Sequence, residues 1–253
     1  MQLPKTEFKS VMPVILARDE VSGLRETVEA LATLLPPADV EKIVMYLAPD
    51  STEECKAAAK ELENTIKTVP VRYVQQQTIV GIEEFQEYML KKSTASHALF
   101  LSADLEVEPE TAVRMLEACK QNPNALVSLT RWGKGGGFSG YPKWQLPLHW
   151  FFQKVVRIMY GARMSTDATA GYAAFPTKIA AGLWLREKRQ SMFLEYKLNL
   201  LCLKMPLIEL PVRYRARREG KSTGSFMHKV RYLVPLICVR FTPRNKLFRF
   251  QEK

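Results

Sequence analysis

The sequence predicts an α/β protein whose mostly parallel, doubly wound sheet carries helices on both faces. Five short apolar runs alternate with longer segments in which apolar residues recur at helical spacing. With 253 residues and 47% apolar content, the chain can bury the core of one large domain, and disorder is not expected. In such sheets, ligands bind beyond the carboxyl ends of the strands.

Each strand is expected where an apolar run is bounded by turn-forming or charged residues. The first run, 10–17, precedes a segment with helical periodicity that ends at Pro36 and Pro37. The same alternation continues to residue 131. The expected strands cover residues 10–17, 43–48, 71–74, 98–103 and 125–131, and the expected helices cover residues 20–35, 52–66, 82–93 and 109–121.

The second half of the chain departs from this rhythm. A glycine-rich loop with Lys134 occupies residues 133–140. Beyond it we expect helices over 144–160 and 192–204, a strand over 207–216 and a basic loop over 213–221. The segment from Phe226 to Val239 predicts an amphipathic helix that Pro235 interrupts.

Charge is distributed unevenly along the chain, whose net charge is +11. Residues 1–117 contain 12 Lys and Arg against 20 Asp and Glu, whereas residues 118–253 contain 25 against 6. This asymmetry is informative about partners rather than about the fold. The basic half is expected to face a polyphosphate, an anionic membrane or nucleic acid, or else to be a solvated surface.

The four cysteines are scattered and form no C-x-x-C pair, so we expect buried thiols in a reducing compartment, without disulfides or a zinc site. The N-terminus lacks the apolar core of a secretory signal. The sequence contains no run of about 18 apolar residues, so no membrane-spanning helix is expected.

A candidate metal and phosphate site follows the fourth expected strand. Ser102, Asp104 and Glu106 alternate, so their oxygens point the same way if the strand continues. Hard oxygen ligands at this spacing suit Mg²⁺ or Mn²⁺ shared with a substrate diphosphate. The alternative is a loop that caps the helix beginning at Pro109.

Two further segments carry candidate residues. Asp167 is the first carboxylate after Glu117, and it could act as a general base, orient a hydroxyl, cap a helix or pair with Arg163. Residues 213–221 contain five Lys and Arg side chains, and guanidinium forks match phosphate oxygens. A single aromatic residue, Tyr214, makes this loop a poor binder of single-stranded nucleic acid. A solvated loop is the alternative.

Taken in order, these segments resemble the family 2 glycosyltransferases, and most of all the dolichyl- or polyprenyl-phosphate mannosyl- and glucosyltransferases. The resemblance extends from about Val11 to about Thr223. Seven short matches carry it: Asp19-Glu20, Ser51-Thr52, Ala103-Asp104-Leu105 with Pro109-Glu110, Thr130-Arg131, Asp167-x-Thr169-x-Gly171-Tyr172, Glu195 with Glu209-Leu210-Pro211, and Arg217-x-x-Gly220-x-Ser222.

The resemblance implies a single domain of the GT-A fold that transfers a sugar, with inversion, from a nucleotide sugar to a polyprenyl phosphate. Residues 1–117 would be the nucleotide-sugar half, 118–224 the acceptor half and 225–253 a basic amphipathic tail. Asp104 and Asp167 would be catalytic, with Asp167 mainly positioning, and Ser102, Asp104 and Glu106 would hold Mg²⁺ or Mn²⁺. The donor would contact Asp19, Glu20, Asp50, Ser51, Ala103 and Asp104, and phosphates would contact Arg131, Arg217, Arg218 and Ser222.

The departures from the family pattern cluster on the nucleotide side. The donor-base aspartates of the family fall on Ala48 and Pro49, its first metal aspartate on Ser102 and its last lysine on Thr223. Either the donor is unusual, or the chain has lost turnover and only binds its ligands. Two alternatives therefore remain: a non-catalytic relative that binds or scaffolds a partner, and a family member with a saccharide acceptor.

The C-terminal segment supports a lipid acceptor. One apolar stripe is expected from Phe226, Val230, Leu233, Leu236 and Ile237, flanked by Lys229, Arg231 and Arg240. Such a helix can lie in the membrane interface, although a helix docked on the core is the alternative. We therefore expect a cytoplasmic protein, peripheral at the cytoplasmic face of a membrane, with room for a membrane-anchored protein partner and no nucleic-acid partner.

Overall fold

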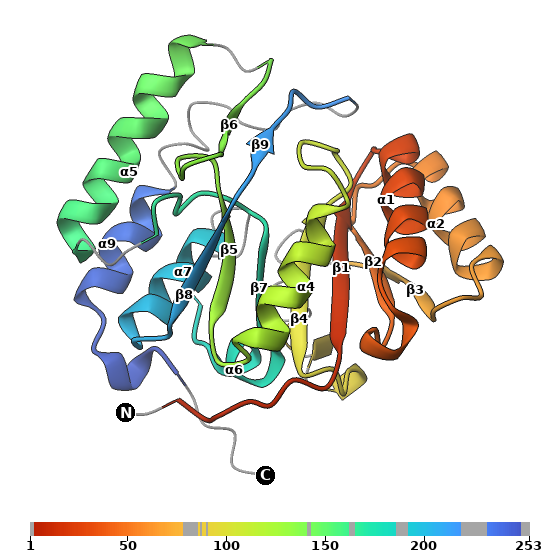
Figure 1. Cartoon of the computed structure of the whole chain (residues 1–253), viewed down its shortest axis with the longest axis horizontal. Coiled ribbons are helices and arrows are strands. Elements are labelled where there is room, and N and C mark those ends of the chain that lie inside the picture. Colours follow the sequence, from red (N-terminus) through yellow and green to blue (C-terminus); the bar gives the residue numbers. More distant parts are fainter. Residues whose placement is uncertain are drawn as a thin grey trace.

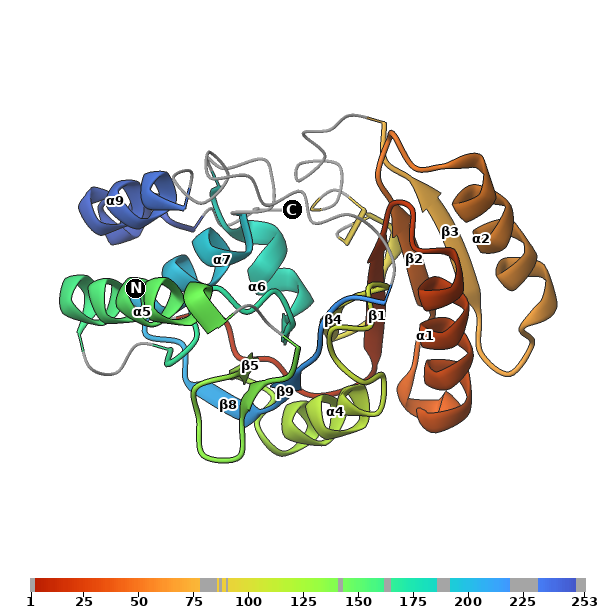
Figure 2. The same cartoon turned by 90° about the horizontal axis from the view of Figure 1, so that it is seen from above.

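A seven-stranded sheet forms the centre of the molecule, and helices cover both of its faces (Figure 1 and Figure 2). The computed structural model describes residues 3–77, 86, 88–89, 91–140, 143–161, 165–185, 192–218 and 232–248. The strand order is β3-β2-β1-β4-β7-β5-β8. Its neighbours pair in parallel except for β7, which runs antiparallel between β4 and β5. The predicted fold class is confirmed.

The strands of the main sheet are β1 (Val11–Ala17), β2 (Ile43–Leu47), β3 (Val71–Gln75), β4 (His97–Ser102), β5 (Leu126–Thr130), β7 (Ala173–Pro176) and β8 (Leu207–Pro211). A small second sheet pairs β6 (Gly137–Phe138) with β9 (Arg213–Tyr214). The α-helices are α1 (Val21–Leu34), α2 (Glu53–Thr65), α4 (Thr111–Gln121), α5 (Leu146–Tyr160), α6 (Thr177–Gly182), α7 (Met192–Cys202) and α9 (Leu233–Phe241).

Alternation along the buried strands builds a core on each face of the sheet. In β1, Val11 and Ile15 face one core, and Met12 and Val14 face the other. The first core is closed by α1, α2 and α4, and the second by α6 and α7, with α5 and α9 packed outside them (Figure 2). Because both faces are covered, the strands read as continuous apolar runs in the sequence.

The antiparallel strand β7 is the main element that the sequence did not predict. It is four residues long, ends in Pro176 and leads directly into α6, so it lacks the longer apolar run that predicted the other strands. Since it runs opposite to its neighbours, its amino end lies at the edge where the parallel strands have their carboxyl ends. The segment 167–172 is therefore delivered to the ligand-binding edge of the sheet.

The C-terminal helix differs from the expected one. Residues 226–231 lie outside the described residues, as do residues 82–85, 87 and 90 of the expected helix 82–93, whereas Gln86, Tyr88 and Met89 are helical. In α9, Leu236 is buried against the core while Leu233 and Ile237 are exposed, so the described residues of the predicted apolar stripe divide between the core and the surface. Pro235 causes no break because it stands in the first turn of α9, where its missing N–H has no helical partner to lose.

Within the described part of the chain, no helix combines the length and apolar character that a bilayer span needs.

Candidate functional site

The loop after β4 brings two carboxylates to the carboxyl edge of the sheet. The strand ends at Ser102, and Leu105 takes a φ of 54°, a left-handed conformation that non-glycine residues seldom adopt. The straight continuation expected for residues 102–106 is therefore wrong. The turn is closed by the N–H of Glu106, which donates to Oδ1 of Asp104 at 3.2 Å. Backbone strain of this kind is often concentrated at functional sites.

Arg217 lies between these two carboxylates. Its Nη2 is 3.2 Å from Oδ2 of Asp104, and its Nε donates to Oε1 of Glu106 at 3.0 Å. Burial opposes the charged guanidinium, but Glu106 and Asp104 raise the pKa of Arg217 above its ordinary value. Burial, with the charge of Asp104, raises the pKa of Glu106 although Arg217 opposes the shift. A predicted phosphate ligand and two predicted metal ligands thus converge.

The two other predicted members of the basic loop are placed differently. Arg218 pairs with Glu26 on α1 at 3.1 Å, and both side chains are about half exposed. Ser222 lies outside the described residues. Of the two described arginines, Arg217 is the one that the structure brings to Asp104.

Tyr172, the residue just before β7, supports Asp104. Its hydroxyl donates to Oδ1 of Asp104 at 3.2 Å, and its ring packs edge-on against Tyr214 at a centroid distance of 5.9 Å. Burial raises the pKa of Tyr172 well above its usual value, so the hydroxyl stays a donor. The sequence offered one signal for this role, the position of Tyr172 at the end of the Asp167-x-Thr169-x-Gly171 motif.

Asp167 and Arg131 form a buried ion pair. Nε and Nη2 of Arg131 donate to Oδ2 and Oδ1 of Asp167 at 2.6 and 2.7 Å, and the backbone N–H of Arg131 donates to Oδ2 at 3.0 Å. Asp167 is fully buried. Burial alone would raise the pKa of the Asp167 carboxyl, but the charge and hydrogen bonds of Arg131 hold it below its ordinary value.

This pairing changes the interpretation of both residues. The guanidinium of Arg131 also lies over the rings of Tyr214, at 4.7 Å, and Phe138, at 5.3 Å. Arg131 was expected to bind a phosphate, but its fork is directed at Asp167. Asp167, expected mainly to position, is directed at Arg131 and has no exposure through which to take a proton from a substrate. The two side chains therefore engage each other in this structure.

Lys197 and Glu209 hold the segment that carries Asp167. Nζ of Lys197 donates to the carbonyl oxygens of Asp167 at 3.3 Å and Ala170 at 2.5 Å. The carboxylate of Glu209 accepts from the N–H of Thr166 at 2.8 Å. Sequence reasoning gave Lys197 no role, because a lysine inside a helix reads as a surface residue. Burial, only partly offset by Asp167 and Glu209, lowers the pKa of Lys197 to about 8.

The stability that Lys197 contributes is expected to rise with pH. Between a folded pKa of about 8 and an unfolded value near 10.5, the unfolded chain binds a proton that the folded chain does not, so raising the pH favours folding. From pH 8 to 9.5, the free energy of unfolding should rise in the wild type relative to Lys197→Met, by at most about 1.4 kcal/mol per pH unit. Urea unfolding at several pH values measures the difference.

The exposed Lys178, changed to Met, is the control for this measurement, because it removes the same charge without a buried site. Its unfolding free energy should run parallel to that of the wild type. Parallel curves for Lys197→Met as well would show that Lys197 is not the titrating group.

The ends of β1 and β2 hold the residues expected on the nucleotide side. The carboxylate of Glu20 accepts from the backbone N–H groups of Arg18 at 2.8 Å and Asp19 at 3.2 Å. Burial, opposed by these hydrogen bonds, raises the pKa of Glu20. Asp50 forms an ion pair with Arg18, and both are partly exposed. Glu20 also lies near enough to Arg217 to favour its charged form. The two groups of predicted residues therefore adjoin.

The remaining predicted donor residues are buried. Ala103 is fully buried, and its carbonyl oxygen lies 2.0 Å from where a Cβ on Gly23 would stand, so α1 can pack here only with a glycine. The hydroxyl of Ser51 is buried and has no hydrogen-bond partner among the described residues. The Ser51 hydroxyl is therefore a group of the predicted donor set at which a ligand or a water is expected.

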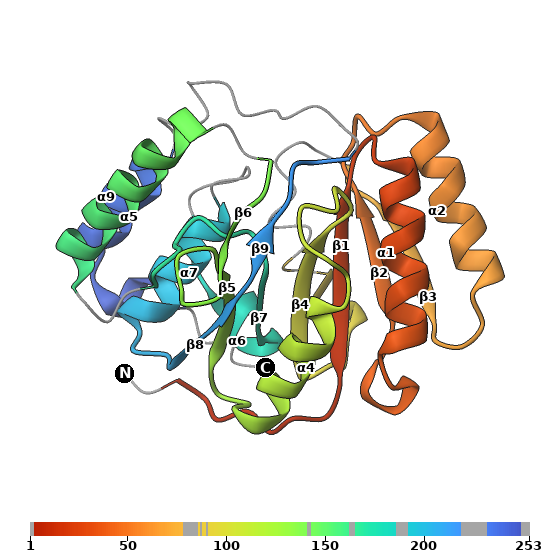
Figure 3. The same ribbon diagram turned by 45° about the horizontal axis from the view of Figure 1, so that its top comes forward.

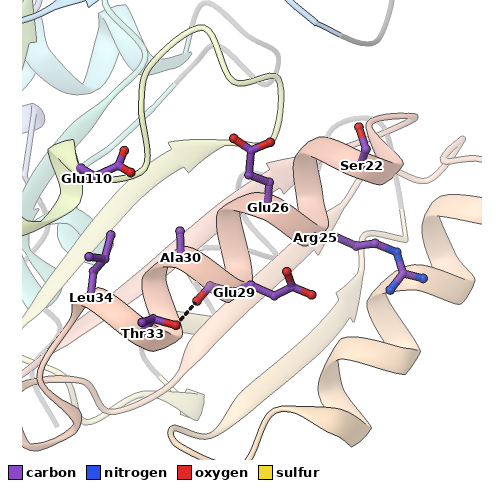
Figure 4. A pocket seen from close by; sticks show the side chains of 8 residues that line it. All are labelled: Ser22, Arg25, Glu26, Glu29, Ala30, Thr33, Leu34 and Glu110. Carbon is purple, nitrogen blue, oxygen red and sulfur yellow. Dashed lines mark hydrogen bonds between the residues drawn. The ribbon is translucent and has the colours of Figure 1, made fainter.

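An open groove of about 570 Å³ runs along α1 (Figure 4). The side chains that line it are Ser22, Arg25, Glu26, Glu29, Ala30, Thr33, Leu34 and Glu110. None of them belongs to the predicted donor, metal or phosphate sets. The groove contributes to the site only through Glu26, which pairs with Arg218.

A divalent cation held by Asp104 and Glu106 would need its remaining ligands from water or from a substrate. In the described part of the chain, no three His, Cys, Asp or Glu side chains are grouped closely enough to bind a metal. Mg²⁺ sites often need only one or two carboxylates when a substrate phosphate completes the coordination. The positively charged guanidinium of Arg217 already forms ion pairs with both carboxylates. The donor set therefore suits a cation that arrives with a diphosphate.

Residues 14–179 match the family model described as glycosyl transferase family 2. No curated protein matches the sequence.

Among solved structures, the chain is similar to glucosyl-3-phosphoglycerate synthase from Mycobacterium tuberculosis. In its complex with UDP, the TM-score is 0.69 at 12% identity, covering 93% of this chain and 81% of that chain. The same enzyme with Mn²⁺, UDP-glucose and phosphoglyceric acid gives 0.68 at 12% identity, with the same coverage. With Mg²⁺ and UDP it gives 0.69 at 12%, covering 93% and 80%. The similarity is one of fold and confirms the GT-A-like architecture.

Proposed function

This chain belongs to glycosyl transferase family 2, and from that premise we propose that it transfers a sugar from a nucleotide-sugar donor to a polyprenyl phosphate at a membrane surface. The observation that carries the proposal is the convergence of Asp104, Glu106 and Arg217 at the carboxyl edge of the sheet. This edge is where ligands bind in folds of this class. Glu20 and Asp50, at the ends of neighbouring strands, extend the same edge toward the nucleotide side.

The proposed reaction needs charge stabilisation more than a strong base. An oxygen of the acceptor phosphate forms a bond to the anomeric carbon of the sugar. The bond from that carbon to the donor diphosphate breaks, and the nucleoside diphosphate leaves with the electron pair. The acceptor phosphate is already anionic, so no proton has to be removed first. This agrees with an Asp167 that is engaged by Arg131 and closed to solvent.

Asp104 and Glu106, with the Ser102 hydroxyl nearby, would hold the divalent cation. When bound, Mg²⁺ or Mn²⁺ neutralises the charge that builds on the leaving diphosphate. The solved structures of similar fold contain Mn²⁺ or Mg²⁺ together with UDP. Arg217 would supply a second positive charge to phosphate oxygens at the same place.

The lipid acceptor is supported by the exposed side chains of α5 and α9, two helices that lie side by side (Figure 2 and Figure 3). Among the described residues, every large exposed apolar side chain except Leu34 lies on these helices or on the turn before α5. They are Trp144, Leu148, Trp150, Phe151, Ile158, Leu233, Val234, Ile237 and Phe241. The two helices are joined where Nε of Arg240 donates to the carbonyl oxygen of Met159 at 3.0 Å.

The charge of this face fits an anionic bilayer. Segments 143–161 and 232–248 contain no Asp or Glu, and Lys154, Arg157 and Arg240 stand among the apolar side chains. A soluble protein rarely exposes so many large apolar residues together unless they meet a partner. Apolar side chains with interspersed basic groups are typical of helices that lie in the membrane interface. Each basic residue adds on the order of 1 kcal/mol near an anionic leaflet.

The function is tested by sugar transfer with purified full-length protein. The protein is mixed with Mn²⁺, a panel of radiolabelled nucleotide sugars, and anionic vesicles that contain a polyprenyl phosphate. We expect label to appear in the lipid phase. Phosphoglycerate and an oligosaccharide, offered in parallel without vesicles, test the acceptors suggested by the structural neighbour and by other family members. If only phosphoglycerate or only the oligosaccharide became labelled, the lipid acceptor would be overturned. If calorimetry detected no binding of any nucleotide-sugar donor, the transferase function would be overturned.

A matched pair of variants separates the acceptor from the membrane contact. Phe151→Asp combined with Phe241→Asp places two charges on the exposed apolar face, away from Asp104. This double variant should lose transfer to polyprenyl phosphate in vesicles while keeping transfer to a short, water-soluble polyprenyl phosphate. Equal activity of wild type and variant on vesicles would show that this face does not dock on the bilayer.

A further inference from the structure

Arg217 occupies the one oxygen of Asp104 that a divalent cation could use without breaking the support of that carboxylate. Oδ1 of Asp104 accepts from the Tyr172 hydroxyl and from the N–H of Glu106, each at 3.2 Å. Oδ2 is 3.2 Å from Nη2 of Arg217. A cation ligated by Asp104 would therefore have to bind Oδ2, where the guanidinium now stands.

We propose that Arg217 and the divalent cation are alternative occupants of the Asp104–Glu106 pair. Without ligand, the guanidinium neutralises both carboxylates. When a cation binds the pair, Arg217 leaves and becomes available to the phosphate oxygens of the incoming donor. The second half of this exchange rests on the proposed transferase function, whereas the competition itself does not.

Electrostatics favours such an exchange. Two carboxylates that stand two residues apart in one turn repel each other at low dielectric, so a counter-charge stabilises the ionised pair. Arg217 supplies one positive charge, and Glu20 adds further negative potential around it. A divalent ion brings two positive charges and binds carboxylate oxygens at shorter range than a guanidinium does. The same location therefore accepts either cation, but not both on one oxygen.

The backbone near Arg217 allows the side chain to move without disturbing the loop. The N–H of Arg215 donates to the carbonyl oxygen of Glu106 at 2.8 Å, which fixes the chain two residues before Arg217. The Arg217 side chain retains about a quarter of its exposure. Rotation about its side-chain bonds can thus carry the guanidinium from the carboxylates toward solvent.

The test measures Mn²⁺ binding to the full chain in the absence of nucleotide, by calorimetry and by the electron paramagnetic resonance signal of free Mn²⁺. Arg217→Gln removes the competing charge and should tighten Mn²⁺ binding about tenfold or more. Arg217→Lys keeps the charge but reaches fewer carboxylate oxygens, so it should give an intermediate affinity. The matched control is Arg215→Gln, which removes the same charge from an exposed pair with Glu108 in the same loop and should change the affinity by less than about twofold.

Asp104→Asn combined with Arg217→Gln should cancel the gain, because the competed oxygen is gone. An unchanged or weaker Mn²⁺ affinity in both Arg217→Gln and Arg217→Lys, with unfolding transitions like that of the wild type, would overturn the competition. The Mn²⁺ assay contains no nucleotide sugar, so its result does not depend on transferase activity. If Arg217→Gln tightened Mn²⁺ binding but the separate assay showed no sugar transfer by the wild type, the competition would stand and the transferase function alone would be contradicted.

Discussion

Asp167→Ala is expected to lower the free energy of unfolding by about 3–5 kcal/mol, the largest stability loss that we anticipate for a single substitution here. The change leaves the guanidinium of Arg131 buried without the carboxylate that receives both of its side-chain donors. It also removes the acceptor for the Arg131 backbone N–H. For a chain of this size, a loss of that order lowers Tm by roughly 6–20 °C.

Urea denaturation followed by circular dichroism measures this loss. Arg218→Ala is the control, because its ion pair with Glu26 is half exposed and should be worth less than about 1 kcal/mol. If Asp167→Ala and Arg218→Ala were equally mild, the Arg131–Asp167 pair would not be the structural anchor that its burial indicates. Asp167→Ala with Arg131→Met should recover part of the stability, since the uncompensated buried charge is removed.

Asp104→Asn is expected to reduce kcat/KM for sugar transfer by about 100-fold or more, with little effect on folding. Asparagine keeps the acceptor for Tyr172 and for the N–H of Glu106, so the turn after β4 is preserved. It replaces the competed carboxylate oxygen with an amide group that repels a cation. Radiolabel transfer at saturating acceptor measures the effect.

Glu108→Gln provides the comparison within the same loop. Glu108 is an exposed carboxylate that pairs with Arg215, so its loss should leave the transfer rate within about twofold of the wild type. An Asp104→Asn enzyme as active as Glu108→Gln would remove Asp104 from the proposed chemistry.

The parallel part of the fold could be predicted because β1, β2, β4 and β5 are buried apolar runs, and because the amphipathic helices α1, α2 and α4 alternate with the strands. Strands β1 to β5, apart from the residues at their ends, lie where the apolar runs predicted them. β7 was missed since four apolar residues between a loop and a short helix carry no periodicity of their own. Its antiparallel direction is a property of the whole sheet, which no local pattern encodes.

The sequence predicted which segments meet at the candidate site, but not how their side chains pair. Alternating carboxylates after β4 and a basic loop after β8 were expected at the carboxyl edge of the sheet, and the structure brings Asp104, Glu106 and Arg217 together there. The sequence does not reveal that Arg131 folds back onto Asp167, because that contact joins residues brought together by β7. Nor does it reveal the left-handed backbone of Leu105, since leucine is not a residue that pattern analysis assigns to such a turn.

The six residues 167–172 serve both sides of the domain at once. Asp167 secures the arginine that follows β5, while Tyr172 secures the carboxylate that follows β4. A chimera that takes residues 167–172 from a relative, but keeps its own segments 102–106 and 130–131, would disturb both the contact with Arg131 and the contact with Asp104. Recombination and library design on this scaffold should accordingly treat the three stretches as one inherited block.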